Sequence, residues 1–122
     1  EFKRSYLWAD NAIKIGKKLG DAYFQRAQVL MSLVENYESI DLNFCDRLIY
    51  DLASEDFESA FKNGNVSSKQ YKEGLEEYVT SAADWFLSSI KENQISPSNS
   101  LCNDKKQSDC YSWVKRTVKR KN

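Results

Sequence analysis

The sequence predicts an all-α fold, a compact bundle of four to five helices with two long antiparallel helices near residues 5–37 and 67–92. The chain has 122 residues, enough for a single helical domain over residues 1–122. It contains one proline and four glycines, whereas an all-β sandwich or barrel needs a turn about every 8–12 residues. Apolar residues also recur at intervals of three and four along most of the chain, which is the period of one helix face.

The first long helix is expected between about residues 5 and 37. Its apolar positions are Trp8, Ala12, Ile15, Leu19, Ala22, Tyr23, Ala27, Leu30, Val34 and Tyr37. Gly16 and Gly20 interrupt it, and each costs about 1 kcal/mol relative to alanine in a helix interior. Because these glycines are four residues apart and share a face, they indicate either a close crossing by another helix or a break in this one.

A second helix is expected to begin at Ser39 or Asp41, since either side chain can cap it. Its predicted core positions are Leu42, Cys45, Leu48, Ile49, Leu52, Phe57, Ala60 and Phe61. Ser54 can restart the helix within this stretch. Asn63-Gly64-Asn65 is expected to end it, because glycine accepts the left-handed conformation that follows a helix C-terminus.

A third long helix is expected over residues 67–92, where Ser67 and Gln70 have the spacing of a capping box. Its apolar stripe is Tyr71, Leu75, Tyr78, Val79, Ala82, Phe86 and Ile90. The turn-forming residues from Ile95 to Ser100 predict a surface loop. A final helix is expected from about Ser108, and its apolar residues are Cys110, Trp113, Val114 and Val118.

The composition argues against catalysis and against metal binding. Histidine is absent, which removes the commonest general base and the usual non-thiolate zinc ligand. The three cysteines include no C-x-x-C pair, and no EF-hand loop occurs. The many carboxylates occupy outward positions with no convergent apolar pocket, unlike the carboxylate pair of a glycosidase. We therefore expect no enzyme activity, no metal and no cofactor.

The net charge of zero hides a strong partition along the chain. Residues 1–34 carry six basic and three acidic side chains, net +3; residues 35–79 carry four and eleven, net −7; residues 80–122 carry eight and four, net +4. This pattern indicates either solvated helix faces that cancel where helices pack or patches complementary to a protein partner. The sequence pI of 6.6 argues against nucleic-acid binding.

Two charged groups are the predicted partner-binding residues. The basic group is Lys115, Arg116, Lys119 and Arg120, and the acidic group is Asp51, Glu55, Glu73 and Glu77. On a helix the four basic residues would form two neighbouring rows that face water. Basic residues are also favoured at any helix C-terminus, so the alternative is that they only end the last helix.

Three features predict a secreted, extracellular protein. The sequence begins at Glu1-Phe2 without methionine, as a signal-cleaved chain does. Asn65-Val66-Ser67 is an N-glycosylation sequon. Cys102 and Cys110 flank a polar loop and are expected to form a disulfide, with Cys45–Cys102 and Cys45–Cys110 as alternatives. No apolar run is long enough for a membrane span.

Short segments resemble one family. The segments are Phe44-Cys45-Asp46, Ala83-Asp84-Trp85-Phe86 and Cys110-Tyr111-Ser112-Trp113-Val114, and they are similar to those of the anophensin/albicin family of anopheline mosquito salivary proteins. The resemblance implies a secreted inhibitor of host plasma proteins: complement convertase components of the alternative pathway, or contact-system factors and kinin release. The competing hypothesis, suggested by the many aromatic residues, is a small-molecule carrier of the helical odorant-binding type.

Overall fold

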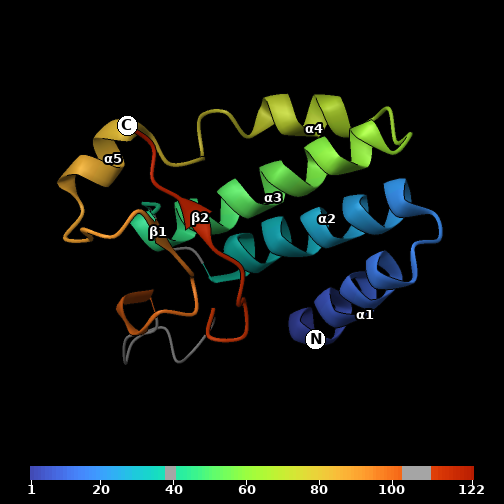
Figure 1. The fold of residues 1–122 in the computed structure, drawn as a ribbon, viewed down its shortest axis with the longest axis horizontal. Helices are drawn as coiled ribbons and strands as arrows, with labels where there is room; N and C mark the ends of the chain where they lie inside the picture. The colour runs from blue at the N-terminus through green and yellow to red at the C-terminus, as the bar shows by residue number, and fades with distance from the viewer. Residues whose placement is uncertain (38–40, 103–110) are drawn as a thin grey trace.

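The computed structural model describes residues 1–37, 41–102 and 111–122, and within these ranges it is an all-α bundle, as predicted. Its five helices are α1 (Phe2–Ile15), α2 (Leu19–Tyr37), α3 (Phe44–Lys62), α4 (Ser68–Gly74) and α5 (Ala82–Leu87). Two short strands, β1 (Gln94–Ile95) and β2 (Val118–Lys119), and a 3₁₀ turn, η1 (Ser100–Cys102), complete the described elements. Two long antiparallel helices lie side by side, and they are α2 and α3 (Figure 1). The predicted partners near residues 5–37 and 67–92 are wrong, because the first range is divided into α1 and α2 and the second contains only the short helices α4 and α5.

The first predicted helix is broken at Gly16. This residue has a φ of 83°, and its backbone N–H donates to the carbonyls of Ala12 and Ile13, which ends α1. Gly20 has the other predicted role, because a Cβ there would lie 2.7 Å from the backbone oxygen of Asn63 at the end of α3. The break and the close approach therefore both occur, each at one of the two glycines.

The second predicted helix forms as α3, without a restart. Its N-cap is Asn43 rather than Asp41, since the Asn43 side chain accepts the N–H of Asp46 while the Asp46 carboxylate accepts the N–H of Asn43. Ser39, the other predicted cap, lies outside the described residues. The buried predicted positions are Leu48, Ile49, Leu52, Phe57 and Ala60, whereas Leu42 and Cys45 are half-buried and Phe61 is exposed. The helix ends at the Asn63-Gly64 turn, as predicted.

The third predicted helix, over residues 67–92, is not continuous, and this prediction is wrong. α4 begins where the Asn65 Oδ1 accepts the N–H of Ser68, and it ends at Gly74, a residue of low helix propensity. Ser81 and Asp84 then form a reciprocal capping box that starts α5 in a new direction. The chain is thereby divided into two short helices joined by turns.

This division changes which side chains are buried. Trp85 is fully buried, and its Nε1–H donates to the Oγ1 of Thr80 at 3.0 Å. Phe86, a predicted core residue, is instead 81% exposed. Of the other predicted positions, Leu75 and Ile90 are buried, Val79 is half-buried, and Tyr71, Tyr78 and Ala82 are exposed.

The C-terminal segment is extended rather than helical, so the predicted last helix is wrong over residues 111–122. β2 pairs antiparallel with β1, with Val118 opposite Ile95. Ile95 is therefore buried, in contrast to the predicted surface loop. Side chains alternate along the segment as in any strand: Val114, Arg116, Val118 and Arg120 are buried or half-buried, while Lys115, Thr117 and Lys119 are exposed. Residues 108–110 lie outside the described part of the chain.

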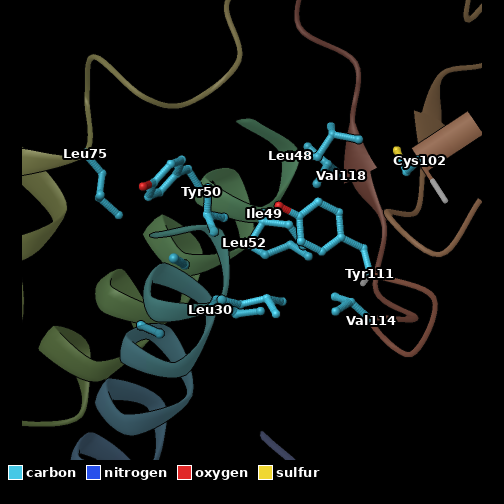
Figure 2. Close-up of a cluster of buried hydrophobic side chains, with 14 of the residues drawn as sticks. Leu30, Leu48, Ile49, Tyr50, Leu52, Leu75, Cys102, Tyr111, Val114 and Val118 are labelled. Carbon is cyan, nitrogen blue, oxygen red and sulfur yellow. The ribbon is translucent and has the colours of Figure 1, made fainter. Parts of the chain in front are cut away.

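The core joins the long helices to the C-terminal segment (Figure 2). Leu30, Leu48, Ile49 and Leu52 belong to the same buried cluster as Tyr111, Val114 and Val118. The Tyr111 hydroxyl also donates to the Asp46 carboxylate of α3 at 2.6 Å. The C-terminal segment is therefore part of the core and not an appended tail.

One disulfide joins Cys45 of α3 to Cys102 of η1, with the two Cα atoms 5.5 Å apart. The predicted Cys102–Cys110 disulfide is therefore wrong, and the alternative Cys45–Cys102 pairing is the one observed. Cys110 lies outside the described residues. The reason for the pairing is that η1 is held beside the start of α3, where Cys102 is buried.

Candidate functional site

The predicted partner-binding residues do not form one surface. Asp51, Glu55, Lys119 and Arg120 line a cleft of about 680 Å³ between α3 and the C-terminal segment. Arg116 lies beside this charged cleft, against Glu55 and Asp56. Lys115, Glu73 and Glu77 are exposed and do not line it. The structure thus brings together four of the eight predicted residues.

Asp56, one of the carboxylates expected at an outward position, is instead buried and binds two arginines from distant parts of the chain. It is 1% exposed. Arg26 donates from Nε and Nη2 to its two oxygens, both at 2.8 Å, and Arg116 donates from Nη1 and Nη2 at 2.8 and 3.0 Å. Burial by itself lowers the pKa of each arginine, but the Asp56 carboxylate outweighs it, so the pKa of Arg26 and that of Arg116 lie above the ordinary value. This buried cluster joins α2 and the C-terminal segment to α3.

A second set of polar contacts holds the end of the chain. Asp51 is buried and accepts hydrogen bonds from the Thr80 hydroxyl and from Lys121 Nζ, the latter at 2.6 Å. Arg120 donates to the carbonyl of Ile90 at 2.9 Å, and its guanidinium lies 5.8 Å from the centre of the Trp85 ring. These contacts fasten the C-terminal segment to α3, α5 and the turns between them.

The prediction that the four basic residues face water is therefore wrong for Arg116 and Arg120, and Asp51 is buried as well. The reason is the period of the segment, because a strand turns every second side chain inward whereas the predicted helix would have turned all four outward. Lys115 and Lys119 do face water. Val114 and Val118 are four residues apart, a spacing that fits a helix as well as a strand, so the local sequence did not reveal the inward arginines.

Glu55 lines the charged cleft and lies next to Arg116. Its partial burial raises the pKa of the Glu55 carboxyl, and the positive charge of Arg116, with Nη2 3.8 Å from Oε1, offsets part of that rise. Glu55 and Lys119 thus leave the cleft with both signs of charge accessible.

The outer face of α1 exposes Trp8, which the sequence analysis placed on the apolar stripe, and its neighbour Leu7. Trp8 is 70% exposed and Leu7 is 51% exposed. With Lys3 and Arg4 they line a shallow groove of about 600 Å³. The face of α1 that is turned inward carries Phe2, Tyr6, Ala9 and Ile13, which also recur at intervals of three and four. The sequence of α1 therefore contains two sets of apolar residues at helical spacing, and the set that packs inward does not include Trp8.

The predicted glycosylation residue, Asn65, lies at the turn between α3 and α4. Its Oδ1 accepts hydrogen bonds from the hydroxyls of Ser67 and Ser68 at 2.9 Å and from the N–H of Ser68 at 3.2 Å. The side chain is half-buried, next to the exposed Val66. The sequon therefore lies in a surface turn, and glycosylation of Asn65 stays a prediction.

Within the described ranges, no group of three or more Cys, Asp or Glu side chains is placed to hold a metal ion. Among the helices described here, none has both the length and the apolar content of a membrane span. Comparison of the chain with protein-family models, curated proteins and solved structures finds no significant match in any of the three.

Proposed function

We propose that this chain is a secreted, non-catalytic inhibitor that binds host plasma proteins and blocks a proteolytic cascade. The first proposed target is the alternative complement pathway convertase, and the second is contact activation with kinin release. The choice of these targets rests on the resemblance described above. Secretion is supported by the Cys45–Cys102 disulfide, because disulfides persist mainly in oxidising compartments, and by the sequon at Asn65.

The observation that carries the proposal of protein binding is the outer face of α1. Trp8 and Leu7 line one groove together with charged residues, and an exposed apolar patch rimmed by polar residues is typical of an interaction site. Tryptophan and arginine are also the residue types most enriched among the side chains that dominate binding energy at protein interfaces. Trp8 and Arg4 line the same groove, so we propose this face as the main contact with the partner.

The exposed charges of the predicted set have a supporting role in this proposal. Lys115, Lys119, Glu55, Glu73 and Glu77 are accessible to a partner. Exposed charges raise the association rate and the specificity of binding more than they raise affinity. The association rate is therefore expected to fall as salt increases, since screening shortens the range of these charges.

Capture from plasma tests the proposal. The wild-type chain, a Leu7→Ser/Trp8→Ser variant and a Phe86→Ser/Leu87→Ser variant are immobilised, incubated with human plasma and analysed by mass spectrometry. The third protein is the matched control, because it removes an exposed apolar pair from α5 instead of α1. The expected result is that wild type and control retain convertase components or contact-system factors, and that the α1 variant retains at least about tenfold less.

Binding is then repeated with the purified proteins identified in the capture. If the α1 variant binds them as tightly as wild type, the contact lies elsewhere on the molecule. If wild type retains no component of either cascade, the proposed targets are wrong.

The small-molecule carrier remains the second proposal, and one observation favours it. A groove of about 530 Å³ between α2, α3 and α4 is lined by three tyrosines, and this volume is in the range of small-ligand sites. A carrier gains thermal stability with the logarithm of the ratio of free ligand concentration to Kd, whereas an inhibitor of proteins gains none from these ligands. Thermal unfolding with and without added ligands separates the two proposals.

A further inference from the structure

The groove between α2, α3 and α4 has features that select a ligand. Its lining includes Met31 and Glu35 of α2, Tyr50 of α3, Tyr71 of α4, and Tyr78. None of these residues belongs to the charged cleft or to the outer face of α1. The groove is therefore a separate site: the inference below rests on the second proposed function, a small-molecule carrier, and does not depend on the proposed plasma target.

The aromatic lining is held in place by the surrounding core. Tyr50 is buried, and its ring points toward the buried Leu75 (Figure 2). The Tyr78 ring lies 5.3 Å from that of Tyr50, at an angle of 31°. Tyr71 stacks on Phe57 with the ring centres 5.3 Å apart. These contacts fix the tyrosine rings before any ligand arrives, so little ordering is needed on binding.

The charge in the described lining of the groove is negative. Glu35 is the only charged side chain in the described lining, and among the residues that the structure describes it forms no ion pair. It is four residues from Met31, so both lie on the same face of α2. An anion is disfavoured here and a cation is attracted.

We infer that this groove binds a small organic ammonium ion with an apolar or aromatic part. The faces of aromatic rings attract ammonium groups, and a carboxylate beside them adds a direct charge partner. In this arrangement the ammonium lies between the tyrosines and Glu35, and the apolar part contacts Met31 and Leu75. A metal ion is not favoured, because the lining offers a single carboxylate.

Calorimetric titration at neutral pH with three related compounds tests this inference. The probes are 2-phenylethylammonium, the neutral 2-phenylethanol and the anionic phenylacetate. Glu35→Gln removes the charge at the groove. Glu76→Gln, an exposed acidic residue nearby that does not line the groove, is the matched control.

Gly74 allows the groove to be filled without disturbing the core. A Cβ at Gly74 would meet no other atom within 4 Å, and Gly74 lines the groove. Gly74→Leu is therefore expected to occupy the groove, whereas Gly74→Ala is the control with the same backbone change. Far-UV circular dichroism of both variants reports whether the helices are retained.

The expected result is that the ammonium compound binds at least about tenfold more tightly than the alcohol, and that phenylacetate binds more weakly still. Glu35→Gln should weaken ammonium binding at least about threefold, Glu76→Gln should change it less than about twofold, and Gly74→Leu should abolish it. Any one of four results would overturn the inference. These are equal binding of the ammonium compound and the alcohol, equal effects of the two glutamine variants, full binding by Gly74→Leu, and no heat of binding with the ammonium compound. None of these outcomes depends on the plasma target.

Discussion

Asp56 is the residue whose removal should have the largest electrostatic effect on folding. Asp56→Ala is expected to lower the free energy of unfolding by about 3–5 kcal/mol, because it leaves two partly buried arginines without their shared carboxylate. Arg116→Ala should cost less, about 1.5–3 kcal/mol, since Arg26 still pairs with Asp56. Urea denaturation measures both values.

Lys115→Ala is the matched control for Arg116→Ala. The two residues are adjacent and equally charged, but Lys115 faces water. Its substitution should change the free energy of unfolding by no more than about 0.5 kcal/mol. Equal destabilisation by the two variants would show that Arg116 is not held by Asp56.

The ion pairs of Glu58 lead to a second prediction about a single residue. Glu58 pairs with Lys72 of α4 and Lys62 of α3. The hydrogen bond from Lys72, followed by its positive charge, lowers the pKa of Glu58 below its ordinary value of 4.5. A carboxylate with a lowered folded-state pKa stabilises the fold above its unfolded pKa, and this stabilisation is lost as the pH falls through the folded pKa. Wild type should therefore exceed Glu58→Gln in stability at neutral pH, and the difference should disappear in acid. A difference that persists unchanged in acid would contradict this assignment.

Gly20 and Gly74 allow a paired prediction of how an added methyl group changes stability. Gly20→Ala should destabilise the protein by about 1–3 kcal/mol, because the added Cβ would lie 2.7 Å from the backbone oxygen of Asn63. Gly74→Ala should stabilise it by up to about 1 kcal/mol, because its Cβ meets open space and alanine favours a helix. Thermal unfolding measures the two shifts. Shifts of the same sign would contradict the close approach of α2 to the end of α3.

The helices that the sequence predicts well are those with one dominant apolar register. α2 and α3 carry many large aliphatic residues at helical spacing, and their buried positions, including Leu30, Leu48 and Leu52, follow that spacing. In α1 two sets of apolar residues have helical spacing, and spacing alone does not reveal which set packs on α2. Beyond Asn65 the local capping box at Ser81 outweighs the continuing apolar period.

The extended C-terminal segment and the charged cleft depend on tertiary contacts. Helical spacing and strand alternation both fit Val114 and Val118, and pairing with β1 decides between them. The pairing turns Arg116 inward to Asp56, a contact between residues 60 positions apart. Such a contact leaves no local pattern in the sequence. The four charged residues of the cleft could therefore be named as candidates, but their meeting in one cleft could not be predicted.

The Cys45–Cys102 disulfide should be a major contribution to the stability of the whole molecule. It links residues 57 positions apart, and joining distant residues restricts the unfolded chain. Cys45→Ser/Cys102→Ser is expected to lower the free energy of unfolding by about 2–5 kcal/mol. Non-reducing peptide mapping of the wild type should recover Cys45 and Cys102 in one linked peptide. A peptide that links Cys102 to Cys110 instead would contradict the structure.

Some of the segment charges are paired with one another within the fold. Arg26 from the first segment and Arg116 and Lys121 from the last pair with Asp56 and Asp51 from the middle. The interpretation that opposite charges cancel where elements pack therefore holds for these residues. The exposed apolar face of α1 has no such internal partner among the described residues, which is why our functional proposal places the partner there.

The central proposal is that the outer face of α1, rather than the basic C-terminal segment, contacts the inhibited plasma protein. The most direct test is the concentration of protein that half-inhibits alternative-pathway lysis of erythrocytes in human serum. We predict that Leu7→Ser/Trp8→Ser raises this concentration at least about tenfold, and that Lys115→Ser/Lys119→Ser raises it less than about threefold. The opposite order of effects, or a wild-type protein that does not inhibit lysis, would contradict the proposal.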